Sequence, residues 1–222
     1  MSKKPPLLDS NAQEGVDTKL YSLARLTLSS SMILDLPVQV ACSAILYFRK
    51  FYTDYSLADY DPMIMVQSAI MLAAKAHEHP RRLRDIVTAV YHLVNSTDGS
   101  PSVPSNSQYW TYKPLLIEME HYLLRALKFD VELDLPHNYV LHFARYLELE
   151  THIATAAFYF CTDFFMTDAV LTHNAQTLAT AAILLAVNMY EGRVFDSHVR
   201  EWNHQPVSLY SNTTFSAAAA VT

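Results

Sequence analysis

Apolar side chains recur every three to four positions along most of this chain, which is the spacing of an amphipathic helix. In the first half the pattern predicts five helices, over residues 15–32, 38–52, 63–78, 81–94 and 109–128. Helix-start signals precede two of them, at Asp35-Leu-Pro37 and Asp61-Pro62, and Pro80 ends the third. Residues 95–106 are rich in Ser, Pro and Gly and therefore predict a linker.

The second half continues the helical pattern after a short connection at residues 130–136. It predicts three further helices, over residues 136–149, 151–166 and 173–190. We expect residues 1–13 to be disordered, because they are polar and contain two prolines. Residues 203–222 are rich in Ser, Thr and Ala without an apolar stripe, which predicts an irregular tail. The pattern gives no reason to expect strands, so the predicted fold class is all-α.

An internal repeat organises these helices. A shift of 113 positions aligns the second and third helices with the pair at 151–166 and 173–190 without a gap. The matched positions are Ala41 with Ala154, Ala44 with Ala157, Phe51 with Phe164, Ala69 with Ala182, Ile70 with Ile183, Leu72 with Leu185 and Ala73 with Ala186. Coincidence between two Ala/Leu-rich helix pairs is the alternative, but an ungapped register over two helices argues against it. The chain is thus predicted to hold two tandem helical units.

The same register predicts that the second unit is incomplete. Its fourth helix would begin near Val194, and its fifth would begin near position 223, beyond the last residue given. We therefore expect a complete five-helix first unit and a truncated second unit whose apolar surface is covered only in part.

Composition narrows the possible functions. Residues of the apolar and aromatic classes make up 51% of the chain, which is enough for a sizeable core. A net charge of −6 argues against general nucleic-acid binding, and the sequence contains neither a signal peptide nor an apolar run long enough for a membrane helix. Cys42 and Cys161, the only cysteines, lie in apolar runs and are expected to be buried core residues.

Catalytic and metal-binding constellations are not evident. Side chains two or five positions apart diverge on a helix, and this applies to the pairs His77 and His79, His137 and His142, and Glu118 and Glu120. The three glycines are too scattered for a phosphate-binding loop. We therefore expect no catalytic residues, no metal and no cofactor, and do not expect an enzyme.

Two charged residues inside apolar helices stand out instead. Lys75 follows Leu72-Ala-Ala in the third helix, and Glu120 lies in the fifth. Solvated helix surface is the ordinary interpretation of each. The repeat favours a function, however, because Lys75 falls on Asn188 while the apolar positions around it are shared.

The chain resembles a cyclin in the segments Leu72-Ala-Ala-Lys75-Ala-His-Glu78-His-Pro80 and Met119-Glu120-His121, followed by Leu124, Leu127 and Phe129-Asp130-Val131. These are similar to the cyclin-box signature. The resemblance implies an N-terminal cyclin box over residues 14–132 and a partial C-terminal box with an irregular tail over residues 133–222. Within the family the chain is most similar to the transcription-associated types, and to cyclin Q in particular, through Leu57-Ala-Asp-Tyr-Asp-Pro62, Tyr109-Trp110 and Leu124-Arg-Ala-Leu-Lys-Phe129.

The resemblance also implies a function. Cyclins are regulatory subunits that bind the C-helix of a cyclin-dependent kinase and shift the kinase to its active state. By position, Lys75 and Glu120 would contact the kinase backbone. Leu124 and Val131 would line the groove for an apolar residue of the C-helix, with Ala76 at its edge.

A likeness to cyclin Q implies cyclin-dependent kinase ten as the partner, and the family implies a nuclear location that can extend to the cytoplasm. From the acidic charge and the lack of a membrane helix we expect no direct nucleic-acid or membrane partner. Two alternatives stay open. The chain could be a cyclin-fold adaptor that activates no kinase, or a truncated competitor that binds a kinase without activating it.

Overall fold

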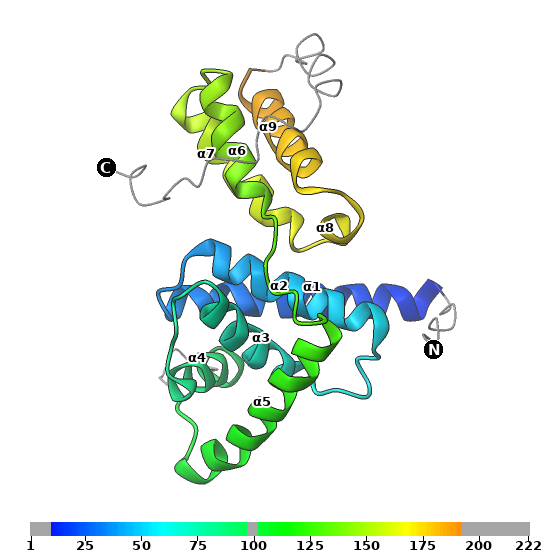
Figure 1. Ribbon diagram of the computed structural model, residues 1–222, viewed down its shortest axis with the longest axis vertical. Coiled ribbons are helices and arrows are strands. Elements are labelled where there is room, and N and C mark those ends of the chain that lie inside the picture. Colours follow the sequence, from blue (N-terminus) through cyan, green and yellow to red (C-terminus); the bar gives the residue numbers. More distant parts are fainter. Residues whose placement is uncertain (1–9, 97–101, 192–222) are drawn as a thin grey trace.

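The computed structural model describes residues 10–96 and 102–191, and every regular element in these ranges is an α-helix (Figure 1). Two groups of helices follow one another along the chain, and we call them the first and the second repeat. The first repeat consists of α1 (Ser10–Ile33), α2 (Val38–Asp54), α3 (Pro62–Ala76), α4 (Leu83–Asn95) and α5 (Asn106–Ala126). The second consists of α6 (Pro136–Tyr146), α7 (Thr151–Phe164), α8 (Ala169–Thr172) and α9 (Ala175–Glu191). The predicted all-α class is confirmed.

Several boundaries differ from the predicted ones. Helix α1 begins at Ser10, so residues 10–13 are helical and the expectation that they are disordered is wrong. Helix α5 begins three residues early because Ser105 and Gln108 form a capping box, in which each side chain bonds the other residue's backbone N–H. The short helix α8 was not predicted. Residues 1–9 and 192–222, including the fourth helix expected near Val194 and the irregular tail, lie outside the described residues.

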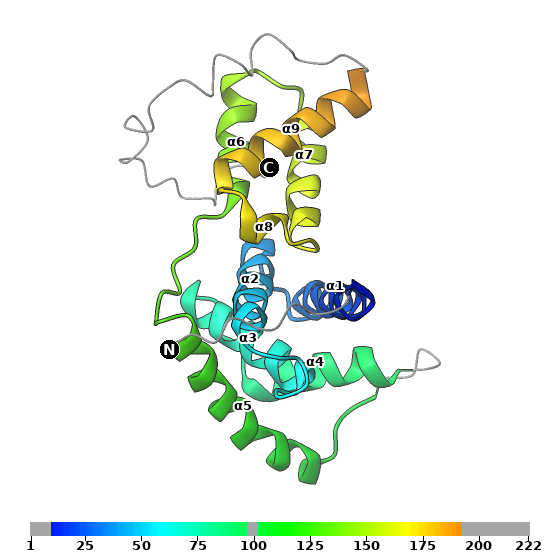
Figure 2. The same cartoon turned by 90° about the vertical axis from the view of Figure 1, so that its right-hand side faces the viewer.

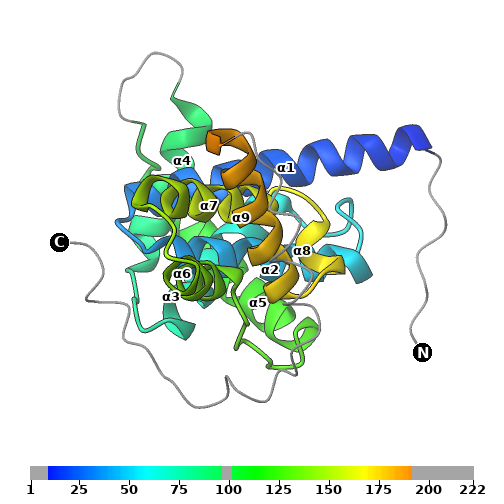
Figure 3. The same ribbon diagram turned by 90° about the horizontal axis from the view of Figure 1, so that it is seen from above.

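Helix α3 is the centre of the first repeat. All its residues from Ile64 to Ala74 are buried, and all of these except Gln67 and Ser68 are apolar. Asp61 caps its first turn by accepting a hydrogen bond from the N–H of Met63 at 2.8 Å, and Pro62 takes the first helical position. Helices α1, α2, α4 and α5 surround it (Figure 2), and the N-terminal turns of α1 project beyond the other helices (Figure 3).

The structure extends the repeat beyond the two helix pairs found in the sequence. The starts of α2 and α7 are 113 positions apart, and so are the starts of α3 and α9. The turns that precede α2 and α7 match as well, because Asp35 and Glu148, also 113 apart, both have a left-handed φ of 51°. Helices α6, α7 and α9 thus stand to one another as α1, α2 and α3 do, around a second core of their own.

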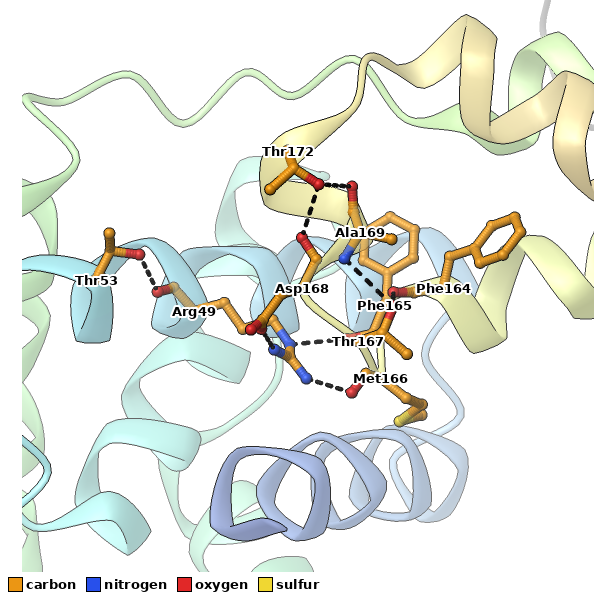
Figure 4. Close-up of polar contacts among 9 residues, drawn as sticks. All are labelled: Arg49, Thr53, Phe164, Phe165, Met166, Thr167, Asp168, Ala169 and Thr172. Carbon is orange, nitrogen blue, oxygen red and sulfur yellow. Dashed lines mark hydrogen bonds and ion pairs between the residues drawn. The ribbon is translucent and has the colours of Figure 1, made fainter. Parts of the chain in front are cut away.

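The two repeats are joined by a buried arginine (Figure 4). Arg49 on α2 is 2% exposed. Its Nε donates to the carbonyl oxygen of Phe165 at 2.9 Å, and its Nη2 donates to that of Met166. Its Nη1 lies 2.6 Å from Oδ1 of Asp168. The fork of the guanidinium therefore holds the corner between α7 and α8 against α2.

Phe165, at the same corner, belongs to the core of the first repeat although it follows a helix of the second. Its side chain is fully buried among residues of the first repeat, and its ring lies over that of His137 at a centroid distance of 5.8 Å. The two repeats therefore share apolar packing as well as the polar contacts of Arg49.

His137, in the first turn of α6, is buried without charge. Its Nε2 lies 3.0 Å from Oγ1 of Thr162, which donates its own proton to the carbonyl of Phe158. Nε2 must therefore carry the ring proton and donate. Nδ1 is buried and has no hydrogen-bond partner among the described residues. Burial lowers the pKa of His137 to about 4, because a proton on Nδ1 would place a charge where no acceptor meets it.

We expect the protein to lose stability as the pH falls from about 6.5 to about 4. The unfolded chain takes up a proton on His137 near its ordinary pKa of 6.5, whereas the folded protein takes it up only near 4. The contribution of His137 to the free energy of unfolding is therefore fully present above pH 6.5, and it declines by about 3 kcal/mol as the pH falls to about 4. Urea unfolding at several pH values measures this decline. His137→Gln should flatten the dependence of the free energy of unfolding on pH across this window.

Candidate functional site

Lys75 and Glu120 are brought together by the packing of α3 against α5. Nζ of Lys75 lies 2.6 Å from Oε1 of Glu120, although the residues are 45 positions apart. The hydroxyl of Ser68 donates to the carbonyl of Leu116 at 3.1 Å and fixes the same pair of helices two turns away from Lys75. The sequence predicted both residues separately, and the structure shows that they form one ion pair.

The two members of this pair differ in exposure. The side chain of Lys75 is 53% exposed, in the last turn of α3, whereas that of Glu120 is only 11% exposed. Because Lys75 is half-exposed, solvent screens the attraction between the two charges, and the net contribution of the pair to stability is small. A buried carboxylate without a partner is costly, however, and the ammonium group of Lys75 balances the negative charge of Glu120. The remaining N–H groups of Lys75 face solvent.

The other predicted site residues lie on the same repeat. Leu124 is one turn after Glu120 on α5, half-buried against the first core, and Val131 is half-buried in the connection to α6. The hydroxyl of Tyr47 donates to the carbonyl of Val131 at 2.6 Å and holds that connection in place. Ala76 is exposed at the end of α3. The structure thus joins Lys75 to Glu120 directly, and places the other three as accessible positions on adjoining segments.

The end of α3 is secured by contacts that the sequence did not reveal. Nε2 of His77 lies 2.7 Å from the hydroxyl oxygen of Ser43 on α2. Arg81, in the segment between α3 and α4, donates to the carbonyls of Leu34 and Asp35 at 2.9 and 2.6 Å. These contacts tie the segment after Lys75 to the helix pair α1–α2. Their acceptors are mostly backbone carbonyls, which leave no signature in a sequence.

The described residues give no support for metal or thiol chemistry. No group of three or more His, Cys, Asp or Glu side chains is placed to hold a metal ion in residues 10–96 and 102–191. Cys42 and Cys161 are buried, as predicted, and burial raises the pKa of the Cys161 thiol to about 12. None of the helices in these ranges is long and apolar enough to cross a membrane.

Comparison with solved structures finds chains of similar fold in several protein complexes. The chain superposes on a chain of the yeast RNA Pol II CTD kinase CTDK-1 complex with a TM-score of 0.74 and 14% identity, covering 91% of this chain and 68% of that one. It also superposes on a chain of the yeast TFIIK (Kin28/Ccl1/Tfb3) complex with a TM-score of 0.59 and 20% identity, covering 80% and 76%. At these identities the likeness concerns the fold.

Comparison with curated proteins finds cyclins. Cyclin pch1 of Schizosaccharomyces pombe is 28% identical over 159 residues, which is 71% of this chain and 46% of the relative. Cyclin-L1 of Danio rerio is 26% identical over 86% of this chain and 39% of the relative. Cyclin-T1-3 of Arabidopsis thaliana is 28% identical over 74% of this chain and 52% of the relative. The chain therefore spans about half the length of these relatives, or less.

The sequence also matches the family described as the cyclin N-terminal domain over residues 22–132, which is half of the chain. The matched segment contains α2 to α5, the second half of α1 and the Lys75–Glu120 pair. The L and T types among the relatives agree with the predicted transcription-associated group. Sequence match, relatives and two-repeat helical fold lead to one conclusion: the chain belongs to the cyclin family.

Proposed function

We propose that this chain is the regulatory subunit of a cyclin-dependent protein kinase, and that it binds the kinase through Lys75, Glu120, Leu124, Val131 and Ala76. The observation that carries the proposal is the ion pair between Lys75 and Glu120, which holds a half-exposed ammonium group beside an almost buried carboxylate. Such a pair offers both hydrogen-bond donors and acceptors to a polypeptide backbone. Family membership supports a kinase as the partner.

The mechanism is a shift of population. A kinase is active when its C-helix is turned inward, so that its own Lys–Glu pair forms on the nucleotide. In our proposal Lys75 and Glu120 contact the kinase backbone just before the C-helix. The half-buried Leu124 and Val131 receive an apolar side chain of that helix, and Ala76 leaves room at the edge. To move the kinase from mostly inactive to mostly active, the chain must bind the active arrangement more tightly by about 5 kcal/mol.

Co-expression with a panel of cyclin-dependent kinases tests this function. The chain is purified through a tag, the co-purifying kinase is identified, and the complex is assayed on a generic peptide substrate. Cyclin-dependent kinase ten is the partner that we propose first, with a nuclear location and no direct nucleic-acid partner. Co-purification with activity supports the proposal. Binding without activity favours a competitor, and the absence of any kinase favours an adaptor.

We expect Lys75→Ala or Glu120→Ala to weaken kinase binding by about 1–3 kcal/mol, because each removes hydrogen bonds that involve a charged group. This corresponds to roughly 5- to 150-fold in affinity, measurable by titration of the purified kinase. Lys50→Ala, which removes an exposed lysine from α2, is the matched control and should leave affinity unchanged.

The buried position of Glu120 requires a second control. Lys75→Ala removes its partner, so thermal unfolding of each variant is measured beside binding. The double variant Lys75→Met with Glu120→Gln removes both charges and leaves no unpaired carboxylate. Kinase affinity unchanged in a folded double variant would contradict the site assignment.

A further inference from the structure

Four aromatic side chains form a connected cluster at the surface of the first repeat, apart from the residues proposed to bind a kinase. We call Phe51, Tyr55, Tyr60 and Tyr122 the aromatic ladder. The ring of Phe51 stacks on that of Tyr55 at a centroid distance of 4.5 Å and meets the edge of Tyr60 at 5.0 Å. Tyr60 in turn contacts Tyr55 at 5.6 Å and Tyr122 at 5.9 Å.

The ladder is both accessible and held in place. Phe51 is buried in the first core, while Tyr55 and Tyr122 are 42% and 39% exposed. The loop that carries Tyr60 is tied down, because the hydroxyl of Tyr52 donates to the carbonyl of Tyr60 at 3.4 Å and Asp61 caps α3. Rigid, partly exposed aromatic rings lose little conformational entropy on binding and are typical binding hot spots.

The surroundings of the ladder are acidic. Asp54, Asp59 and Asp61 are all exposed on the segment that carries Tyr55 and Tyr60, and the hydroxyl of Tyr122 donates to Glu118 at 3.3 Å. No lysine or arginine occurs between residues 51 and 74, so the acidic character belongs to the part of the ladder with Tyr55 and Tyr60, while the exposed Arg125 lies one turn after Tyr122 on α5. The charge of this surface therefore complements a partner that carries lysine or arginine.

We propose that the aromatic ladder binds a proline-rich peptide segment that carries basic residues. Proline rings pack on the faces of tyrosine rings, and polyproline II segments dock on aromatic-lined surfaces in this way. One turn of that helix advances about 9 Å, so prolines three residues apart lie on the same side of the peptide and can pack on different rings of the ladder. A polyproline II backbone has no internal hydrogen bonds, so its carbonyls are available to accept from the hydroxyl of Tyr55, while that of Tyr122 donates to Glu118.

Titration with synthetic peptides tests this proposal on the full chain. The probe is a fluorescently labelled peptide of Pro-Pro-Lys repeats, and its binding is measured by fluorescence anisotropy. We expect it to bind, and we expect Tyr55→Ser and Tyr122→Ser each to weaken it on the order of tenfold. Tyr159→Ser, which changes an exposed tyrosine of the second repeat, should leave binding unchanged. Gly-Gly-Lys repeats of equal charge and Pro-Pro-Glu repeats should bind far more weakly.

Equal binding of the Gly-Gly-Lys peptide would overturn the proposal, because charge alone would then explain the affinity. Unchanged binding by both ladder variants would also overturn it. Lys75→Ala separates this surface from the proposed kinase site: peptide binding should be retained in that variant, and its loss would contradict a separate surface. Conversely, a chain that binds no kinase but binds the peptide through Tyr55 and Tyr122 would leave this inference standing while the proposed function fails.

Discussion

Replacing Phe165 by Ala is expected to lower the free energy of unfolding by about 3–5 kcal/mol. The side chain is fully buried among residues of the first repeat, and its loss leaves a cavity that the packed helices around it cannot fill. Because the residue itself follows a helix of the second repeat, the cavity opens where the two repeats meet. Urea unfolding of the purified variant measures the loss.

Tyr159→Ala is the matched control for that variant. It removes an aromatic side chain of similar size from α7, but this ring is 66% exposed, so the free energy of unfolding should change by no more than about 0.5 kcal/mol. Hydrogen exchange adds a second measurement. Faster exchange in both α2 and α7 of Phe165→Ala would agree with a shared core, whereas faster exchange in α7 alone would contradict it.

Arg49→Ala is expected to lower the free energy of unfolding by about 2–5 kcal/mol. The variant leaves the buried carbonyl of Phe165 and the part-buried carbonyl of Met166 without their donor, and a buried unpaired group costs about 1–3 kcal/mol. The packing of the buried side chain is lost as well. The ion pair to Asp168 adds little, since the side chain of Asp168 is mostly exposed.

Two further variants distinguish the carbonyl contacts from the ion pair. Asp168→Asn removes only the negative charge and should cost less than about 1 kcal/mol. Arg49→Lys retains a positive charge but lacks the fork that reaches two carbonyls, so it should lose most of the stability that Arg49→Ala loses. A cost for Asp168→Asn as large as that for Arg49→Ala would show that the charge, and not the carbonyl contacts, holds the corner.

The sequence was informative where local rules decide the structure. Pro37, Asp61 and Pro136 stand at the starts of α2, α3 and α6, and these starts were predicted to within one residue. The early start of α5 was also readable, because Ser105 and Gln108 have the spacing of a capping box. At the candidate site, the repeat directed attention to Lys75, since its counterpart Asn188 has no charge.

Contacts between the repeats could not be predicted in the same way. Arg49 looks like any arginine on an amphipathic helix, and two of its three partners are backbone carbonyls, which any residue could supply. Phe165 continues the apolar pattern of α7, but the pattern does not reveal which core receives it. The aromatic ladder joins side chains of α2, α5 and the loop before α3, and no sequence spacing brings Tyr60 to Tyr122.

The burial of Phe165 also decides where this polypeptide can be divided. The cyclin match ends at residue 132, and a recombinant fragment cut there would lack the ring that completes its core. It would also remove the two carbonyls and the carboxylate that the guanidinium of Arg49 contacts. The smallest autonomously folding fragment should therefore extend to at least residue 168, so truncation limits drawn from the family alignment pass through the middle of one cooperative unit.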